Sequence, residues 1–186
     1  MPPRSKSKPA LKISGPLLRR LRRVKLFLCD VDGVLTDASV FISEGVEIKR
    51  FHIQDGLGLR LLQKNGIRVG WVSNRPSTAT TERANELMVD FLYQDKAGKV
   101  AAVEGILREA GVEWDEVCYV GDDIVDLGVL RRAGLAVSVA NAIEEAKQQA
   151  HYVTRAEGGN GAVREIVTLL LRAQGKWDDL VKQYSA

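Results

Sequence analysis

The chain alternates short apolar runs with longer stretches of helical periodicity. Each apolar run has the length and β-branched content of a buried strand. The predicted strands are residues 24–29, 67–73, 89–93, 116–120, 135–139 and a short extended run at 151–154. Helices are predicted at residues 16–23, 55–65, 77–87, 98–111, 143–149 and 162–173, with one more ending at Gly134. Strands that alternate with helices predict right-handed βαβ units, and so an α/β domain with a doubly wound parallel sheet.

Residues 38–53 do not fit this order of strands and helices. They show partial strand-like alternation on either side of Glu44-Gly45, which predicts a β-hairpin inserted after the first strand. An isolated hairpin is marginally stable in water, and this one has more apolar side chains than it can cover. We therefore expect the hairpin to need a partner surface. Its apolar positions are Val40, Ile42, Val46, Ile48, Phe51 and Ile53.

Three segments divide the chain: a basic leader at residues 1–23, one globular domain at 24–175 and a polar tail at 176–186. The leader is expected to be disordered apart from its short helix. Residues 1–25 hold nine basic and no acidic residues, which leaves 18 basic against 24 acidic residues in the rest. A solvated leader is favoured over one that binds nucleic acid or membrane, because no aromatic residue interleaves with its charges.

Composition and hydropathy favour a cytoplasmic protein. Cys29 and Cys118 lie in apolar runs without a CxxC pattern, as buried reduced thiols do. No apolar run approaches the ~20 residues of a membrane span. The N-terminus lacks the apolar core of a secretory signal, and an organelle transit peptide is the alternative interpretation of its basic, serine-containing sequence.

Polar residues follow four successive predicted strands or begin the helices beyond them. The carboxyl ends of strands in such a sheet are where ligands bind. Asp30 and Asp32 alone could form a solvated turn, but acids, a hydroxyl and a lysine in this order favour a site. Buried acids need a cation or a proton. The set is Asp30, Asp32, Ser73, Lys99, Asp122, Asp123 and Asp126.

This set suits phosphoryl chemistry. Carboxylate oxygens favour Mg²⁺, which polarises phosphoryl oxygens. Lys99 would stabilise charge on the phosphoryl group and Ser73 would donate a hydrogen bond to it. Asp30 can then attack phosphorus as a carboxylate nucleophile. Asp32 can protonate the leaving oxygen and later activate water.

The motifs DVDG at 30–33, Ser73, Lys99 and GDDIVD at 121–126 resemble those of the haloacid dehalogenase superfamily of phosphohydrolases. The resemblance implies a Rossmann-type fold with Asp30 as nucleophile and Asp32 as acid/base. It implies Mg²⁺ held by Asp30, the backbone carbonyl of Asp32, and Asp122. Asp123 and Asp126 would support the metal, and Ser73, Asn74 and Lys99 would bind phosphate.

Within that superfamily, residues 21–175 are similar to the cap-less 3-deoxy-D-manno-octulosonate 8-phosphate phosphatases. The shared stretches include FHIQDGLG, YVGDDIVDL and AHYVTRAEGGNGAVRE. The resemblance implies hydrolysis of that sugar phosphate in lipopolysaccharide biosynthesis by a homotetramer whose hairpins pack together. A phosphatase for a nonulosonate 9-phosphate or another small ester is the alternative. An idle scaffold with a nucleic-acid-binding tail is a further one.

Two positions depart from the family pattern and bear on the substrate. Asn74 stands in VSNR where relatives commonly have the glycine of Thr-Gly-Arg, while Ser73 and Arg75 match that pattern. Asn160 stands in GGNG where relatives often carry arginine. Asparagine cannot replace the charge of an arginine that pairs with a carboxylate. Arg75 and Asn160 are the candidate substrate contacts, and the cation for a substrate carboxylate must come from Arg75, Arg60 or Lys49.

Overall fold

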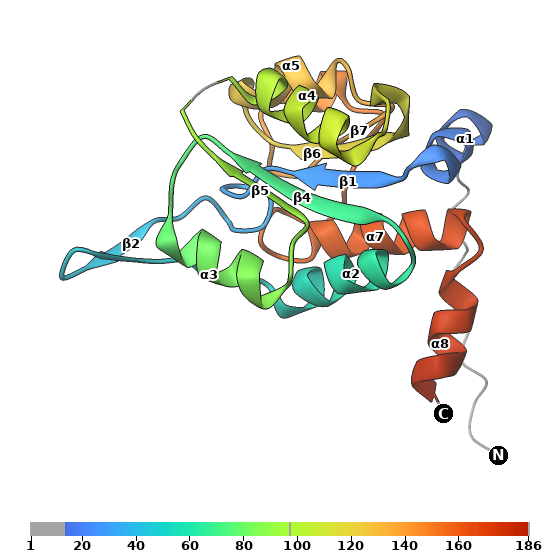
Figure 1. Ribbon diagram of the computed structural model, residues 1–186, viewed down its shortest axis with the longest axis horizontal. Coiled ribbons are helices and arrows are strands. Elements are labelled where there is room, and N and C mark those ends of the chain that lie inside the picture. Colours follow the sequence, from blue (N-terminus) through green and yellow to red (C-terminus); the bar gives the residue numbers. More distant parts are fainter. Residues whose placement is uncertain (1–13, 97, 186) are drawn as a thin grey trace.

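A six-stranded parallel sheet forms the centre of the computed structural model, which describes residues 14–96 and 98–185 (Figure 1). The strand order is β5-β4-β1-β6-β7-β8. The predicted doubly wound α/β fold is therefore confirmed. The strands are β1 (Leu26–Cys29), β4 (Arg68–Ser73), β5 (Phe91–Gln94), β6 (Val117–Gly121), β7 (Leu135–Ser138) and β8 (Tyr152–Val153).

Strand β1 lies in the middle of the sheet because all four of its residues are apolar and fully buried. It pairs in parallel with β4 on one side and β6 on the other, with Leu26 aligned to Arg68 and Val117. The backbone N–H of Asp30 donates to the carbonyl of Val120 at 2.9 Å, so the pairing reaches the first acidic residue. The ends of β1 and β6 are thus fixed next to each other.

Helices cover both faces of the sheet. Figure 1 shows α4 and α5 on one face and α2, α3 and α7 on the other. The helix predicted at 55–65 begins two residues earlier, at Ile53, and the strand predicted at 89–93 begins two residues later, at Phe91. The helices are α1 (Gly15–Arg23), α2 (Ile53–Lys64), α3 (Thr78–Glu86), α4 (Lys99–Ala110), α5 (Leu127–Leu130), α6 (Glu144–Gln149) and α7 (Ala162–Ala173), with short 3₁₀ turns at η1 (Trp114–Glu116) and η2 (Ile124–Asp126).

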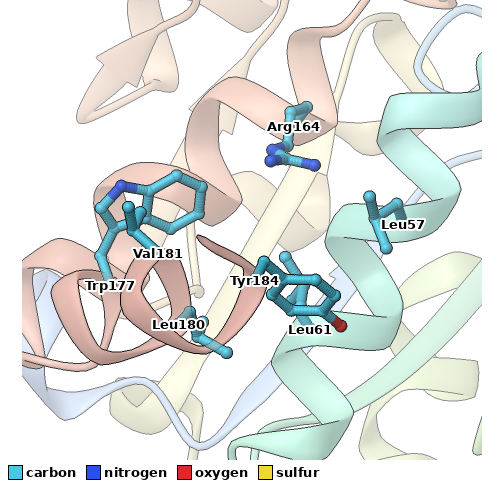
Figure 2. Close-up of a pocket in the computed structure, with 7 residues that line it drawn as sticks. All are labelled: Leu57, Leu61, Arg164, Trp177, Leu180, Val181 and Tyr184. Carbon is cyan, nitrogen blue, oxygen red and sulfur yellow. The ribbon is translucent and has the colours of Figure 1, made fainter. Parts of the chain in front are cut away.

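The C-terminal tail contains one more helix, α8 (Trp177–Ser185), which sequence analysis did not predict. Guanidinium groups of Arg164 and Arg172 lie 5.4 and 5.8 Å from the Trp177 ring centre. Figure 2 shows the apolar pocket between α8, α7 and α2. No residue of the predicted site lines it. Among the described residues no helix is long and apolar enough to cross a membrane. Residues 1–13 of the predicted leader lie outside the described part.

The predicted hairpin forms a separate two-stranded sheet of β2 (Phe41–Ser43) and β3 (Val46–Ile48) that projects from the body (Figure 1). Glu44 and Gly45 both have positive φ, 52° and 77°, as a two-residue type I′ turn requires. The hairpin is shorter than predicted, because residues after Ile48 leave the strand and contact the body. Phe51 stacks on Trp71 of β4, with ring centres 6.1 Å apart. Between residues 14 and 185, leaving out residue 97, no cap domain covers the sheet.

The glycine-rich loop at 156–161 packs directly on the loop that follows β1. The N–H of Gly159 donates to the carbonyl of Val34 at 2.9 Å. A Cβ on Gly158 would lie 1.7 Å from the carbonyl oxygen of Gly33. Position 158 therefore excludes every side chain, since that contact is with backbone and cannot rotate away.

We expect Gly158→Ala to destabilise the protein by about 2 kcal/mol or more, because backbone must move to admit a methyl group. Gly105→Ala is the matched control. Gly105 lies in α4 with only the end of the Arg108 side chain, at 3.9 Å, near an added Cβ. This control should stabilise by about 0.5–1 kcal/mol, as alanine does in helices. Urea midpoints at one protein concentration measure both. An unchanged midpoint for Gly158→Ala would contradict the close packing.

Candidate active site

Lys99 is the centre of a buried charge cluster at the carboxyl edge of the sheet. Its side chain is almost fully buried at the start of α4. The ammonium lies 2.9 Å from Asp30 Oδ1 and 2.7 Å from Asp126 Oδ1. Burial alone would lower the Lys99 pKa, but the two carboxylates raise it above its usual value. Lys99 is therefore a fixed cation.

Asp126 is held on all sides by hydrogen bonds. Its Oδ1 accepts from Lys99 and from the hydroxyl of Tyr119, a buried residue of β6. Its Oδ2 accepts the backbone N–H groups of Asp122 and Asp123 at 3.1 and 3.3 Å. These contacts fix the turn that follows β6. Asp126 thus holds the backbone that carries Asp122 and Asp123.

Asp30 and Asp122 are compensated less fully than Asp126, although Lys99 contacts Asp30. Burial, and then the Asp126 carboxylate, raise the pKa of Asp30 to about 6. Burial, together with Asp30 and Asp126, raises the pKa of Asp122 to about 8. Asp122 Oδ1 is buried with no hydrogen-bond partner among the described residues. One lysine does not neutralise three acids.

A divalent cation fits this cluster. Single carboxylate oxygens of Asp30, Asp122 and Asp126 all lie within 4.8 Å of one another. Oxygen-only ligands suit Mg²⁺. Since Asp126 is already saturated with donors, Asp30 and Asp122 are the side chains that would hold the ion. Asp123 is exposed and is not one of these grouped acids; its Oδ1 accepts from the N–H of Ile124 at 2.6 Å.

Asp32 lies apart from this cluster and contacts a lysine of the hairpin. Lys49 Nζ is 2.7 Å from Asp32 Oδ1, while Asp32 Oδ2 is buried without a hydrogen-bond partner among the described residues. The two aspartates of DVDG therefore have different environments. Asp30 contacts Lys99, and Asp32 contacts Lys49.

The predicted phosphate-binding loop follows β4. Ser73 is buried, and its hydroxyl donates to the carbonyl of Arg75 at 3.2 Å and accepts from the Arg75 N–H at 3.1 Å. Asn74 lies between them. The Arg75 guanidinium makes an ion pair with Glu47 of β3. The hairpin thus joins this loop as well as the loop that carries Asp32.

Asn160, the other predicted substrate contact, lies beside an arginine that sequence analysis missed. Its Oδ1 accepts from Arg50 at 3.1 Å, and Arg50 also pairs with Asp37 at 3.0 Å. Arg60 donates to Gln63 Oε1 of α2 at 2.7 Å and to the carbonyl of Leu87, which ends α3, at 3.0 Å. Three cations were predicted as partners of a substrate carboxylate. Of these, Lys49 forms an ion pair with Asp32, and Arg75 forms one with Glu47.

Asp55 lies in α2 but caps the start of another helix, α7. It is buried in the first turn of α2, and its carboxylate accepts the backbone N–H groups of Gly161 at 3.2 Å and Arg164 at 2.6 Å. A carboxylate there compensates the positive end of the α7 dipole. This contact spans more than a hundred residues, so no local pattern could reveal it. It fixes the glycine-rich loop.

Comparisons with known proteins agree with this geometry. Residues 73–166 match the model of the haloacid dehalogenase-like hydrolase family. The 3-deoxy-D-manno-octulosonate 8-phosphate phosphatase of Yersinia pestis is 38% identical over 165 residues, which cover 88% of each protein.

Solved structures of similar proteins point to the same family. The Moraxella catarrhalis 3-deoxy-D-manno-octulosonate 8-phosphate phosphatase, in complex with magnesium, phosphate and KDO, has a TM-score of 0.87 at 38% identity, covering 90% of this chain and 97% of that chain. A probable phosphatase of Pseudomonas syringae has a TM-score of 0.90 at 38% identity, covering 93% and 99%. This chain therefore belongs to the haloacid dehalogenase-like hydrolases, within the family of 3-deoxy-D-manno-octulosonate 8-phosphate phosphatases.

Proposed function

We propose that the protein is a Mg²⁺-dependent phosphomonoesterase that hydrolyses 3-deoxy-D-manno-octulosonate 8-phosphate to the free sugar acid and phosphate. The buried cluster of Asp30, Lys99, Asp122 and Asp126 is the observation that carries this proposal. A cluster of acids with a single lysine is costly to bury unless a metal ion binds there. The identity of the substrate is inferred from the names of the relatives described above.

The reaction follows from what each side chain can do. Asp30 attacks phosphorus, so that a bond forms between its carboxylate oxygen and phosphorus while the ester bond breaks. Asp32 gives a proton to the leaving sugar oxygen and then takes one from the water that hydrolyses the aspartyl phosphate. Lys99 keeps Asp30 ionised and stabilises charge on the phosphoryl oxygens. Ser73 and the backbone at Asn74 bind the phosphate.

Mg²⁺, when bound, polarises the phosphoryl group and offsets its charge near the nucleophile. Asp30, Asp122 and the backbone carbonyl of Asp32 would hold it, with Asp126 and Asp123 as supporting residues. Two observations support this assignment: Asp122 Oδ1 has no described partner, and all oxygens of Asp126 are occupied by donors.

The carboxylate of the substrate needs a cation. Arg75 is the candidate, because its guanidinium is partly exposed next to the phosphate-binding loop. Asn160 would contact the sugar by hydrogen bonds only. A nonulosonate 9-phosphate carries the same carboxylate and is the alternative substrate. An idle scaffold is disfavoured, because nothing in such a role would compensate burial of the acid cluster.

A homotetramer built by the hairpins is the proposed assembly. Val40, Phe41, Ile42, Val46 and Ile48 are 46–71% exposed, a concentration of apolar surface that monomers rarely carry. We also propose that it is a cytoplasmic enzyme of lipopolysaccharide biosynthesis that acts on a small molecule and not on membrane or nucleic acid; membership of the phosphatase family supports this assignment.

Purified protein should release phosphate from 3-deoxy-D-manno-octulosonate 8-phosphate with Mg²⁺ and stop in EDTA. An uncharged sugar phosphate of similar length should react with a roughly 10- to 150-fold lower kcat/KM, since a charged hydrogen bond to a carboxylate contributes about 1.5–3 kcal/mol. Full activity in EDTA would exclude a metal. Equal rates with acidic and neutral sugars would leave the chemistry intact and reject the substrate assignment.

Asp30→Asn should lower turnover by at least about 10³-fold, as loss of a nucleophile does, while the fold is kept. The amide keeps the shape of the side chain but lacks the attacking charge. Phosphate release and circular dichroism are measured on the same preparation. Asp178→Asn on α8 is the control and should retain full activity. A variant at Asp30 that keeps more than about a tenth of the activity would rule out this residue as nucleophile.

Replacement of Val40 and Ile42 by lysine should yield smaller species in light scattering, because charged side chains oppose burial of the hairpin between subunits. Val181→Lys, which changes an exposed valine on α8, should leave the mass unchanged. A wild-type protein with the mass of a monomer would contradict the proposed assembly.

A further inference from the structure

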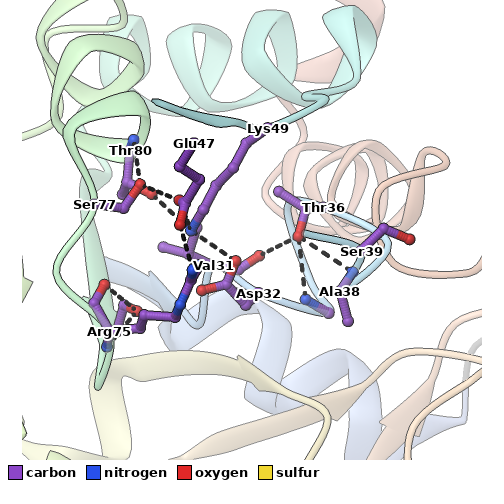
Figure 3. Close-up of polar contacts among 12 residues, drawn as sticks. Val31, Asp32, Thr36, Ala38, Ser39, Glu47, Lys49, Arg75, Ser77 and Thr80 are labelled. Carbon is purple, nitrogen blue, oxygen red and sulfur yellow. Dashed lines mark hydrogen bonds and ion pairs between the residues drawn. The ribbon is translucent and has the colours of Figure 1, made fainter. Parts of the chain in front are cut away.

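Lys49 has a buried side chain at the base of the hairpin and is not explained by the proposed reaction. None of its side chain is exposed. Its ammonium lies 2.7 Å from Asp32 Oδ1, 3.2 Å from Thr80 Oγ1 and 3.5 Å from Glu47 Oε1 (Figure 3). A buried ammonium with two carboxylates and a hydroxyl around it has a fixed position.

The partners of Lys49 are themselves anchored. Thr80 is fully buried in the first turn of α3. Glu47 accepts from the hydroxyl of Ser77, the N-cap of α3, at 2.6 Å, and it also pairs with Arg75. Figure 3 shows Glu47 and Lys49 directed together toward Asp32 and the start of α3. Lys49 is therefore fixed by a rigid helix start, although the hairpin tip stands clear of the body.

The contact makes the two oxygens of Asp32 different. Oδ1 is bound by Lys49, and Oδ2 is buried without a described hydrogen-bond partner. A general acid needs one oxygen that carries the proton and faces the leaving group. We propose that Lys49 is a positioning residue, which binds Oδ1 so that Oδ2 of Asp32 is held for proton transfer. The proposal rests on the assigned role of Asp32.

The proton balance follows from this arrangement. In the first step the Oδ2–H bond breaks, and its proton goes to the sugar oxygen as the ester bond breaks and Asp30 binds phosphorus. In the second step Oδ2 takes a proton from water as the water oxygen attacks phosphorus and Asp30 is released. Lys49 takes no part in this proton balance and touches no reacting atom.

Leaving-group dependence tests this role. A general acid matters for an alkoxide leaving group and little for p-nitrophenolate, which leaves without a proton. Since kcat/KM reports the steps up to the first irreversible one, it isolates the departure of the leaving group. Lys49→Met should lower kcat/KM for an alkyl phosphate by about 10- to 100-fold, and for p-nitrophenyl phosphate by less than about threefold, given that positioned acids contribute 10²–10⁴-fold.

The variant should fold, because Glu47 keeps Ser77 and Arg75 as partners and the Asp32 side chain is 23% exposed to water. Thr80→Val is a second variant, which removes one tether of Lys49 and keeps its charge. In this variant, too, kcat/KM should fall more for the alkyl phosphate than for p-nitrophenyl phosphate, but the loss should be smaller than in Lys49→Met. Lys25→Met is the control: this exposed lysine pairs with Glu116 and should affect neither substrate.

Equal losses with both substrates in Lys49→Met would overturn the proposal, and so would an unchanged kcat/KM for the alkyl phosphate. If Lys49→Met does not fold, Thr80→Val decides by the same comparison. A wild-type protein without Mg²⁺-dependent hydrolysis of either substrate would instead reject the proposed function. The two failures are therefore distinguishable.

Discussion

The burial of like charges at the carboxyl end of β1 is the constraint on which the site depends. Asp30, Asp122 and Asp126 have oxygens within 4.8 Å of one another and share one ammonium, that of Lys99. Removing carboxylates from water costs several kcal/mol each unless opposite charge offsets it. Burial, and then the neighbouring carboxylates, raise the pKa of both Asp30 and Asp122, in keeping with this shortage of positive charge. A divalent ion supplies the charge that Lys99 does not.

The sheet makes this arrangement possible because its central strands are apolar throughout. β1 and β6 are paired in register up to Cys29 and Val120, so that the acids which follow them emerge side by side. Tyr119 reaches Asp126 from within β6, and the glycine-rich loop closes on the Asp32 loop without room for a side chain at Gly158. Backbone geometry, more than side-chain flexibility, sets the positions of the acids.

The sequence predicted the parallel sheet, the hairpin and the acid cluster because each has a local signal: apolar runs, alternation around Glu44-Gly45, and acids at strand ends. It did not predict contacts between side chains that are far apart in the sequence. Asp55 caps α7, and Lys49 contacts Asp32 rather than serving as a free cation. The i, i+2 spacing of Glu47 in β3 and Lys49 just after it was a usable signal that both side chains point the same way. The helix at Trp177–Ser185 was missed although its apolar residues recur at i, i+3, i+4 and i+7, which was a usable signal. Its contact with two arginines through the Trp177 ring depends on residues of α7 and has no local signal.

The two aspartates of DVDG are therefore held by different parts of the molecule. Asp30 contacts Lys99, which is fixed by the buried β6 turn, and its position does not involve the hairpin. Asp32 contacts Lys49, whose chain continues into the exposed strands β2 and β3. A partner surface that covers the hairpin would restrict the segment that carries Lys49. Assembly would then act on proton transfer by Asp32 and leave attack by Asp30 unaffected, because no described contact joins Asp30 to the hairpin.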